Sequence, residues 1–229
     1  MDISQPQIEL RQTHDGSSTL YNVTIGEHYH SLHGALQESQ HIFLKAALEY
    51  RASRDQVPLS ILEVGFGTGL NALLTFLWAE RMRRSVTYTT LELYPISPEL
   101  AGELVYELEG ISSERIRECL CRLHAAPWGE VVELTSYFRL FKQQIDLRYY
   151  EPRSSVDVVY FDAFSPDIQP ELWMECIFDR LYRATAPGGV LTTYSAKGEV
   201  RRRLQRAGYQ VERLAGPIGK REILRASKH

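Results

Sequence analysis

The feature that most constrains the fold is an apolar stretch that breaks into three closely spaced glycines. Residues 61–64 are apolar apart from one acid, and an apolar run resumes at Ala72. Buried parallel strands appear as continuous apolar runs, and glycine allows a sharp turn while leaving room for a ligand. The glycines are Gly65, Gly67 and Gly69. The stretch predicts a strand, a tight turn and a helix from about Thr68, whose free N–H groups face a nucleotide-like cofactor.

The spacing of these glycines indicates which cofactor to expect. A dinucleotide fingerprint requires Gly-x-Gly-x-x-Gly, but Leu70 occupies the position of its third glycine. Glu63 lies two residues before the first glycine, which suits a cationic or amine-bearing ligand better than a pyrophosphate. S-adenosylmethionine carries a sulfonium, an amine and ribose hydroxyls but no phosphate, so the pattern favours it over NAD. The plain structural alternative is a glycine-rich turn beside a satisfied surface glutamate.

The length and composition of the chain indicate one globular domain with an extension. The 229 residues have an ordinary apolar content, and no apolar run reaches the roughly 18 residues of a membrane span. We expect an N-terminal extension of short strands and a helix over residues 1–57 and the core over residues 58–229. The N-terminus lacks the pattern of a signal peptide. The three cysteines lack paired spacing and predict reduced thiols, so we expect a cytoplasmic protein without membrane contact.

Charge is unevenly distributed along the chain. From Val190 onward there are ten Lys or Arg side chains against three acids, a local charge of +7, although the whole chain carries −3. A basic end on an acidic body indicates a phosphate-bearing partner. The shorter basic run from Arg81 to Arg84 is typical of a solvated helix end.

Alternating strand and helix signals predict an α/β fold with a doubly wound, Rossmann-like sheet. A stop signal at residues 186–189 separates the last helix–strand unit from the one before it, and the final two strands are expected to form an antiparallel hairpin. Predicted strands cover residues 19–25, 58–64, 86–94, 131–141, 155–161, 190–194, 209–214 and 222–226. Predicted helices cover residues 36–51, 68–82, 98–109, 113–123, 170–185 and 197–204.

Acidic side chains follow several of the predicted strands. In an open α/β sheet, ligands bind beyond the carboxyl ends of the strands, so Glu92 is placed to accept hydrogen bonds from both ribose hydroxyls of a cofactor. Asp162 faces the same crevice, where it can hold an amine and help disperse a proton, and Phe164 can stack on a flat ring. Asp162 as a helix cap or salt-bridged strand end is the structural alternative. Asp146 is either an adenine contact or a solvated loop residue.

Three histidines lie close together near the N-terminus. His28, His30 and His33 stand beside Glu27, but no second ligand group at a characteristic spacing accompanies them. We therefore expect no metal site.

Five motifs together carry a resemblance to a known family. They are Glu-Val-Gly-Phe-Gly-Thr-Gly-Leu-Asn at 63–71, Val-Tyr-Phe-Asp-Ala-Phe-Ser-Pro at 159–166, Ala-Pro-Gly-Gly at 186–189, Ala-Lys-Gly-Glu-Val-Arg-Arg at 196–202 and Gly-Lys-Arg-Glu at 219–222. In this combination the chain resembles the methyltransferase domain of the MnmC family from about Tyr21 to Ala226. The resemblance implies methylation by S-adenosylmethionine of 5-aminomethyl-2-thiouridine at the wobble position of tRNA anticodons, after other enzymes have made the aminomethyl precursor.

The resemblance also implies roles for individual residues. Asp162 would be the amine-facing catalytic acid, Glu92 the ribose contact and Asp146 the adenine contact, although Ile145 stands where the family commonly has glycine. The remaining predicted cofactor contacts are Glu63, Gly65, Phe66, Gly67, Thr68, Gly69, Asn71 and again Asp162. The predicted substrate contacts are Tyr29, His30, Ser31 and Phe164, with Lys197, Arg201, Arg202, Lys220 and Arg221 on tRNA phosphates. Glu38 is similar to a family acid downstream of the tyrosine motif.

Two further expectations follow. Bifunctional members of the family carry an FAD-dependent oxidase domain, and because no second glycine-rich motif follows in this chain, we expect a standalone methyltransferase. The competing functions are an aminopropyl- or small-amine transferase, which would not need the basic end, and a noncatalytic RNA-binding module. The acids at positions 63, 92 and 162 count against the binding module.

Overall fold

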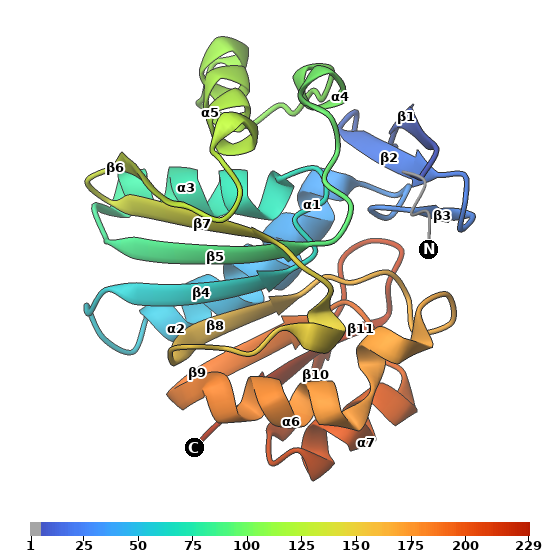
Figure 1. Ribbon diagram of the computed structural model, residues 1–229, viewed down its shortest axis with the longest axis vertical. Coiled ribbons are helices and arrows are strands. Elements are labelled where there is room, and N and C mark those ends of the chain that lie inside the picture. Colours follow the sequence, from blue (N-terminus) through green and yellow to red (C-terminus); the bar gives the residue numbers. More distant parts are fainter. Residues whose placement is uncertain (1–5) are drawn as a thin grey trace.

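A mixed eight-stranded sheet forms the centre of the computed structural model, which describes residues 6–229 (Figure 1). The strand order is β10-β11-β9-β8-β4-β5-β7-β6. The five inner strands from β9 to β7 are mutually parallel, whereas β11, β10 and β6 run antiparallel to their neighbours. The strands are β4 (Leu59–Val64), β5 (Val86–Glu92), β6 (Val131–Thr135), β7 (Phe138–Gln144), β8 (Val156–Phe161), β9 (Thr185–Thr193), β10 (Gln210–Ala215) and β11 (Glu222–Ser227). The predicted doubly wound sheet with its antiparallel end is confirmed.

Helices cover both faces of this sheet, as Figure 1 shows. One face carries the long helix that runs from α1 through the π-helical η1 to α2, together with α3, on which α5 packs. The other face carries α6 and α7. The bounds are α1 Ala35–Ser39, η1 Gln40–Glu49, α2 Tyr50–Ala52, α3 Leu70–Met82, α4 Pro98–Gly102, α5 Ser113–Ala125, η2 Leu147–Tyr149, η3 Pro170–Trp173, α6 Glu175–Ala184 and α7 Gly198–Arg206.

The inner strands are apolar on both faces because both faces are covered. Along β4, Ile61 packs with the α3 side and Leu62 with the α6 side, and neither side chain is exposed. On β8, Tyr160 likewise packs on the α3 side of the sheet and Phe161 on the α6 side. This is why these strands appear in the sequence as continuous apolar runs rather than as an alternating pattern.

A small antiparallel sheet lies beside the carboxyl ends of β4 and β5 (Figure 1). It consists of β1 (Ile8–Gln12), β2 (Ser18–Asn22) and β3 (Glu27–His28), so the predicted strand over 19–25 ends three residues early. The helix that follows shares a core with the main sheet through Ile42 and Phe43. The division at residues 57/58 stays a prediction, and residues 1–5 of the predicted extension lie outside the described residues.

Several predicted elements have different bounds. Residues 131–141 form not one strand but the hairpin of β6 and β7, whose turn at residues 136–137 lacks a glycine or proline that would have marked it. The helix predicted to reach residue 109 ends at Gly102, because the chain then becomes extended and Val105 exchanges hydrogen bonds with Ser18 on β2. The helix over 170–185 divides into η3 and α6, and β9 already begins at Thr185, where a register shift against β8 includes the predicted stop signal.

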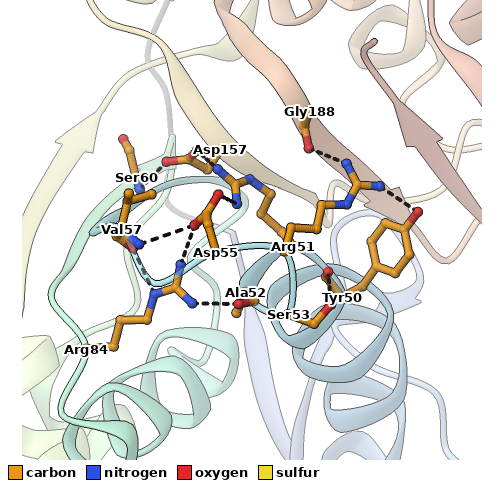
Figure 2. A network of polar contacts seen from close by, with 11 residues as sticks. Tyr50, Arg51, Ala52, Ser53, Asp55, Val57, Ser60, Arg84, Asp157 and Gly188 are labelled. Carbon is orange, nitrogen blue, oxygen red and sulfur yellow. Dashed lines mark hydrogen bonds and ion pairs between the residues drawn. The ribbon is translucent and has the colours of Figure 1, made fainter.

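Arg84 is buried, contrary to the prediction of a solvated basic helix end. Its side chain is 7% exposed and donates to the carbonyls of Val57 and Ala52, while it pairs with Asp55 at 3.1 Å. Figure 2 shows this network, which joins the end of α2 to the entry of β4. Helix geometry explains the difference, since Arg83 leaves α3 in a left-handed conformation and turns the next side chain inward.

Within residues 6–229, no helix is both long and apolar enough to cross a lipid bilayer.

Candidate active site

A cavity of about 580 Å³ opens at the carboxyl ends of β4, β5, β7 and β8. The glycine turn after β4 forms one wall, and the ends of β5 and β8 form the floor. The segment from Gly26 to His33 covers the cavity from the N-terminal side, and Lys220 reaches it from the β10–β11 loop. The volume suits one cofactor together with part of a second ligand. The strand ends that the sequence predicted to face a ligand therefore do meet at one cavity.

The glycine turn brings two strand ends into close contact. Gly65 has a φ of +89°, and a Cβ atom there would lie 2.6 Å from the carbonyl oxygen of Asp162. Gly67 has a φ of +50°, and its Cβ would lie 3.0 Å from the ring of Tyr29. Positive φ and such close approach are both costly for any residue with a side chain. The turn is thus shaped by the strand beside it and by the segment above it.

Glu92 fixes the turn and keeps acceptor capacity free. Its Oε2 accepts from the backbone N–H of Gly67 at 3.0 Å, and its Oε1 accepts from that of Tyr94 at 2.9 Å. Each carboxylate oxygen has a second lone pair, and Glu92 lines the cavity. This arrangement can accept hydrogen bonds from two adjacent ribose hydroxyls, as the sequence predicts.

Asp162 stands across the cavity beside Asn71. Its Oδ2 accepts from Asn71 Nδ2 at 2.8 Å, and its backbone N–H donates to Val64 at 3.0 Å. Burial raises the pKa of Asp162 to about 7, and the nearby charge of Glu38 acts in the same direction, whereas the Asn71 bond and Lys220 lower the pKa. A half-buried carboxyl group that titrates near neutral pH can both hold an amine and take a proton from it.

The cavity fits an adenosyl cofactor that carries no phosphate. Among the described residues, the Lys and Arg side chains that line it are Arg148 and Lys220, and each is already paired with a carboxylate. Acidic side chains surround the turn, which is unfavourable for a pyrophosphate but favourable for a cationic sulfonium and an amine. Asn71, at the start of α3, also has a buried Oδ1 without a partner.

Comparison with known proteins shows a similarity to methyltransferases. A family described as S-adenosyl-L-methionine-dependent methyltransferase matches residues 129–229. The bifunctional tRNA 5-methylaminomethyl-2-thiouridine biosynthesis proteins MnmC of Azoarcus and Nitrosospira multiformis are 35% and 32% identical over 90% of this chain. The crystal structure of MnmC2 from Aquifex aeolicus matches with a TM-score of 0.75 and 29% identity, over 98% of this chain and 72% of that one.

The chain is therefore similar in sequence to the MnmC proteins and in fold to MnmC2, and its C-terminal part matches a methyltransferase family. It spans about a third of the length of the bifunctional relatives, since it covers 34% of each of the two named above. The expected cofactor, S-adenosylmethionine, is the one on which the matching family depends.

Glu63 lies behind the glycine turn rather than in the cavity wall. Its side chain is completely buried, and its Oε2 accepts from the hydroxyl of Thr90 at 2.7 Å. Burial raises the pKa of Glu63 to about 8. Gly69 also stands outside the lining, so direct cofactor contact by these two residues stays a prediction, whereas Gly65, Phe66, Gly67, Thr68 and Asn71 line the cavity.

Asp146 lines the cavity but is already engaged. Arg148 forms an ion pair with it at 2.6 Å and holds the pKa of Asp146 below its usual range. Asp146 also accepts from the backbone of Arg148, as the cap of the short helix η2. An adenine contact would share this carboxylate with Arg148 and stays a prediction.

The N-terminal residues predicted to bind substrate do gather over the cavity. The rings of Tyr29 and Phe164 meet edge to face with centroids 5.0 Å apart. The backbone N–H of Ser31 donates to Glu38 at 2.8 Å, and Glu27 accepts from the backbone of Ser165 at 3.1 Å. The His30 ring lies 3.2 Å from the Thr19 hydroxyl, and burial lowers its pKa to about 4. In residues 6–229, no cluster of three or more His, Cys, Asp or Glu side chains is arranged to hold a metal ion.

The five basic residues predicted to contact tRNA do not form one group. Lys220 lies inside the cavity, where it pairs with Glu38. Lys197 is exposed and pairs with Asp167. The others, Arg201, Arg202 and Arg221, lie outside the cavity lining and make no ion pair with any of the described residues. Their contact with tRNA stays a prediction.

Sequence reasoning missed the support behind the glycine turn. Lys142 is 1% exposed, has no carboxylate partner among residues 6–229, and faces the rings of Trp128 at 4.6 Å and Phe66 at 5.4 Å. It donates to the carbonyl of His124, whose Nε2 donates to the carbonyl of Thr68 at 2.9 Å. Burial without a counterion lowers the pKa of Lys142 to about 8. The only local signal for burial of Lys142 was its place directly after a β-prone run.

Proposed function

We propose that this chain transfers a methyl group from S-adenosylmethionine to the primary amine of 5-aminomethyl-(2-thio)uridine at the tRNA wobble position. The observation that carries the proposal is the position of Asp162, at the floor of the same cavity as the glycine turn and Glu92. The bifunctional relatives are named for tRNA 5-methylaminomethyl-2-thiouridine, which is the product that this transfer would give. Bound cofactor would supply an electrophilic methyl group, so that the amine nitrogen forms the new N–C bond as the C–S bond breaks.

Asp162 would select and prepare the amine. An alkylammonium group in water has a pKa of about 10, as in lysine, and only the neutral amine has a lone pair with which to attack. A carboxylate with a pKa near 7 is a stronger base than an ordinary aspartate, and desolvation in the cavity lowers the pKa of the ammonium group. Asn71 holds the carboxylate in one orientation, which supports a defined line of approach.

Tyr29 and Phe164 would hold the uracil ring. The two rings lie edge to face at the cavity. Phe164 comes from the loop after β8 that also carries Asp162, and Tyr29 comes from the segment that covers the cavity. RNA-modifying proteins commonly splay a target base out of the stack and place it against aromatic side chains. A wobble nucleotide lies in an unpaired loop, so extruding it costs little.

The partner would be the anticodon region of tRNA. Arg201, Arg202 and Arg221 supply cations that are not neutralised by a described carboxylate, within the basic end of the chain. Unpaired surface cations are the groups that bind phosphates with release of counterions. Enzymes that make the aminomethyl group would act upstream, and a tRNA substrate would fit a cytoplasmic location.

A competition experiment tests this proposal. The protein is incubated with methyl-labelled S-adenosylmethionine, tRNA that contains aminomethyluridine, and a polyamine in equal amounts. We expect label in the tRNA and none in the polyamine. Label in the polyamine would favour a small-amine transferase. No transfer, together with no cofactor binding by calorimetry, would favour a noncatalytic RNA-binding module.

A further inference from the structure

Lys220 lies beside a buried carboxylate in the cavity, whereas a phosphate-binding lysine would be expected on the surface. Its Nζ lies 3.2 Å from Oε1 of Glu38, which is 7% exposed, and 4.7 Å from the ring centroid of Tyr194. The hydroxyl of Tyr194 donates to the carbonyl of Ala163, the residue after Asp162. The lysine head group therefore points into the acceptor end of the cavity rather than out towards solvent.

The backbone around Lys220 is built to hold it there. Gly219 has a φ of +88°, and a Cβ atom at this position would collide with the ring of His33. His41 donates from Nε2 to the carbonyl of Ala215 at 2.7 Å. The β10–β11 loop is thus pressed against the N-terminal segment that covers the cavity. Two parts of the chain distant in sequence meet to form one charged pair.

We propose that the Glu38–Lys220 ion pair sets the charge of the acceptor end of the cavity: Lys220 cancels the charge of Glu38, so that the carboxylate of Asp162 stays ionised and takes a proton from the incoming ammonium group. This inference rests on the proposed function, because it concerns the amine. Glu38 and Lys220 act through Asp162, and we regard them as positioning residues.

The proton balance of this step is complete. The ammonium group gives one proton to Asp162 and becomes a neutral amine. After transfer, the methylated nitrogen carries one positive charge, and Asp162 gives its proton to water, which restores the carboxylate. No further oxidant or co-reactant is needed.

The groups around Asp162 determine the direction of each expected change. Glu38 opposes its ionisation, whereas Asn71 and Lys220 favour it, and the buried Glu63 is mainly protonated at pH 7. Tyr194 stays neutral, since burial raises its pKa. Removing Lys220 alone leaves Glu38 uncompensated, and removing Glu38 alone leaves Lys220 uncompensated. The two substitutions should therefore shift the titration of Asp162 in opposite directions.

The test compares the acid limb of kcat/KM against pH for five variants. Lys220→Met should move the limb to higher pH by about one unit, and Glu38→Gln should move it to lower pH. The Glu38→Gln/Lys220→Met double variant should return towards the wild-type profile because both charges are gone. Lys220→Arg should stay close to wild type. Lys45→Met, an exposed lysine on η1, controls for general loss of charge.

A second readout does not depend on the substrate. The pKa of Asp162 is followed by NMR of carboxyl-labelled aspartate, with its resonance assigned by its loss in Asp162→Asn. If wild-type protein methylates no tRNA amine, the proposed function falls, and this titration alone decides the inference. If Asp162 titrates alike in wild type, Lys220→Met and Glu38→Gln, the inference is overturned even where methyl transfer succeeds. Opposite shifts support it.

Discussion

At the scale of single residues, Asp162 has to be a base while burial favours its neutral form. Burial raises its pKa to about 7, and Asn71 holds its carboxylate by one hydrogen bond. The raised pKa means that the carboxylate is present above about pH 7 and is lost as the pH falls through that value. We therefore expect kcat/KM for the tRNA amine to fall about tenfold for each unit of pH below 7, as measured in initial-rate assays.

The substitution Asp162→Asn tests the same residue without a change of pH. The amide keeps the size of the side chain but accepts no proton, so we expect at least a roughly 100-fold loss of kcat. Cofactor affinity by calorimetry should change less than threefold, because the turn and Glu92 remain. A variant that kept full activity would remove Asp162 from the mechanism.

Glu63 leads to a different residue-scale prediction. Since burial raises its pKa to about 8, it is mainly protonated at pH 7, and glutamine is a close substitute. We expect Glu63→Gln to bind S-adenosylmethionine within about threefold of wild type. Glu63→Ala leaves the buried Thr90 hydroxyl without its acceptor and should cost about 1–3 kcal/mol of stability. A tenfold loss of affinity in Glu63→Gln would instead indicate that a negative charge there attracts the sulfonium.

At the scale of elements, the network of Figure 2 joins α2 to three strands at the end of the sheet opposite the cavity. Arg51 pairs with Asp157 on β8 at 2.9 Å, Asp157 accepts from the backbone of Ser60 on β4, and Arg54 donates to the carbonyl of Gly188 on β9. The first helix and the sheet are therefore linked by polar contacts as well as by apolar packing.

Arg84 and Arg81 form a matched pair for testing this network. Arg84→Met leaves the carbonyls of Val57 and Ala52 without this donor and removes one of the two arginines that pair with Asp55, so we expect a loss of roughly 2–4 kcal/mol in the free energy of unfolding. Arg81 is exposed and lies 3.8 Å from Glu49, so Arg81→Met should change stability by less than about 0.5 kcal/mol. Urea unfolding measures both. Equal losses in the two variants would contradict the structural role given to the network.

The same elements show what a local pattern can and cannot predict. The inner strands could be predicted because burial on both faces requires a continuous apolar run. The turn could be predicted because its positive φ angles favour glycine. The β6–β7 hairpin could not, since its turn contains no breaking residue and its alternation continues across the turn. Arg84 looks the same in sequence as an exposed arginine, because only the left-handed turn at Arg83 directs it inward.

Some residues of the candidate site could likewise be predicted from the sequence, whereas others could not. Glu92 and Asp162 could be placed at the cavity because each follows a parallel strand, and such strand ends meet at one edge of the sheet. Lys220 could not, because its place depends on packing between the β10–β11 loop and a segment almost two hundred residues earlier. Charge counting included Lys220 in a phosphate-binding surface, whereas tertiary contact puts it beside Glu38.

At the scale of the whole molecule, six of the ten cations from residue 190 onward already pair with acids. We expect the triple variant of Arg201, Arg202 and Arg221 to alanine to bind tRNA more weakly and with a shallower dependence on salt. The slope of log affinity against log salt should fall by up to about 0.7–0.9 for each tRNA phosphate that the variant no longer neutralises.

The control for this prediction is Arg117→Ala, an exposed arginine on α5. Filter binding between low and moderate salt gives both slopes. An unchanged slope in the triple variant, or an equal change in the control, would place the tRNA surface elsewhere on the molecule.

The proposed reaction of this chain is methylation of the amine of a wobble uridine. The most direct measurement is mass spectrometry of nucleosides from tRNA that carries aminomethyluridine, after incubation with the protein and S-adenosylmethionine. We expect that this nucleoside gains one methyl group, that tRNA without the aminomethyl group gains none, and that Asp162→Asn abolishes the change. An aminomethyluridine that stays unmodified, or a methyl group found on another nucleoside, would contradict it.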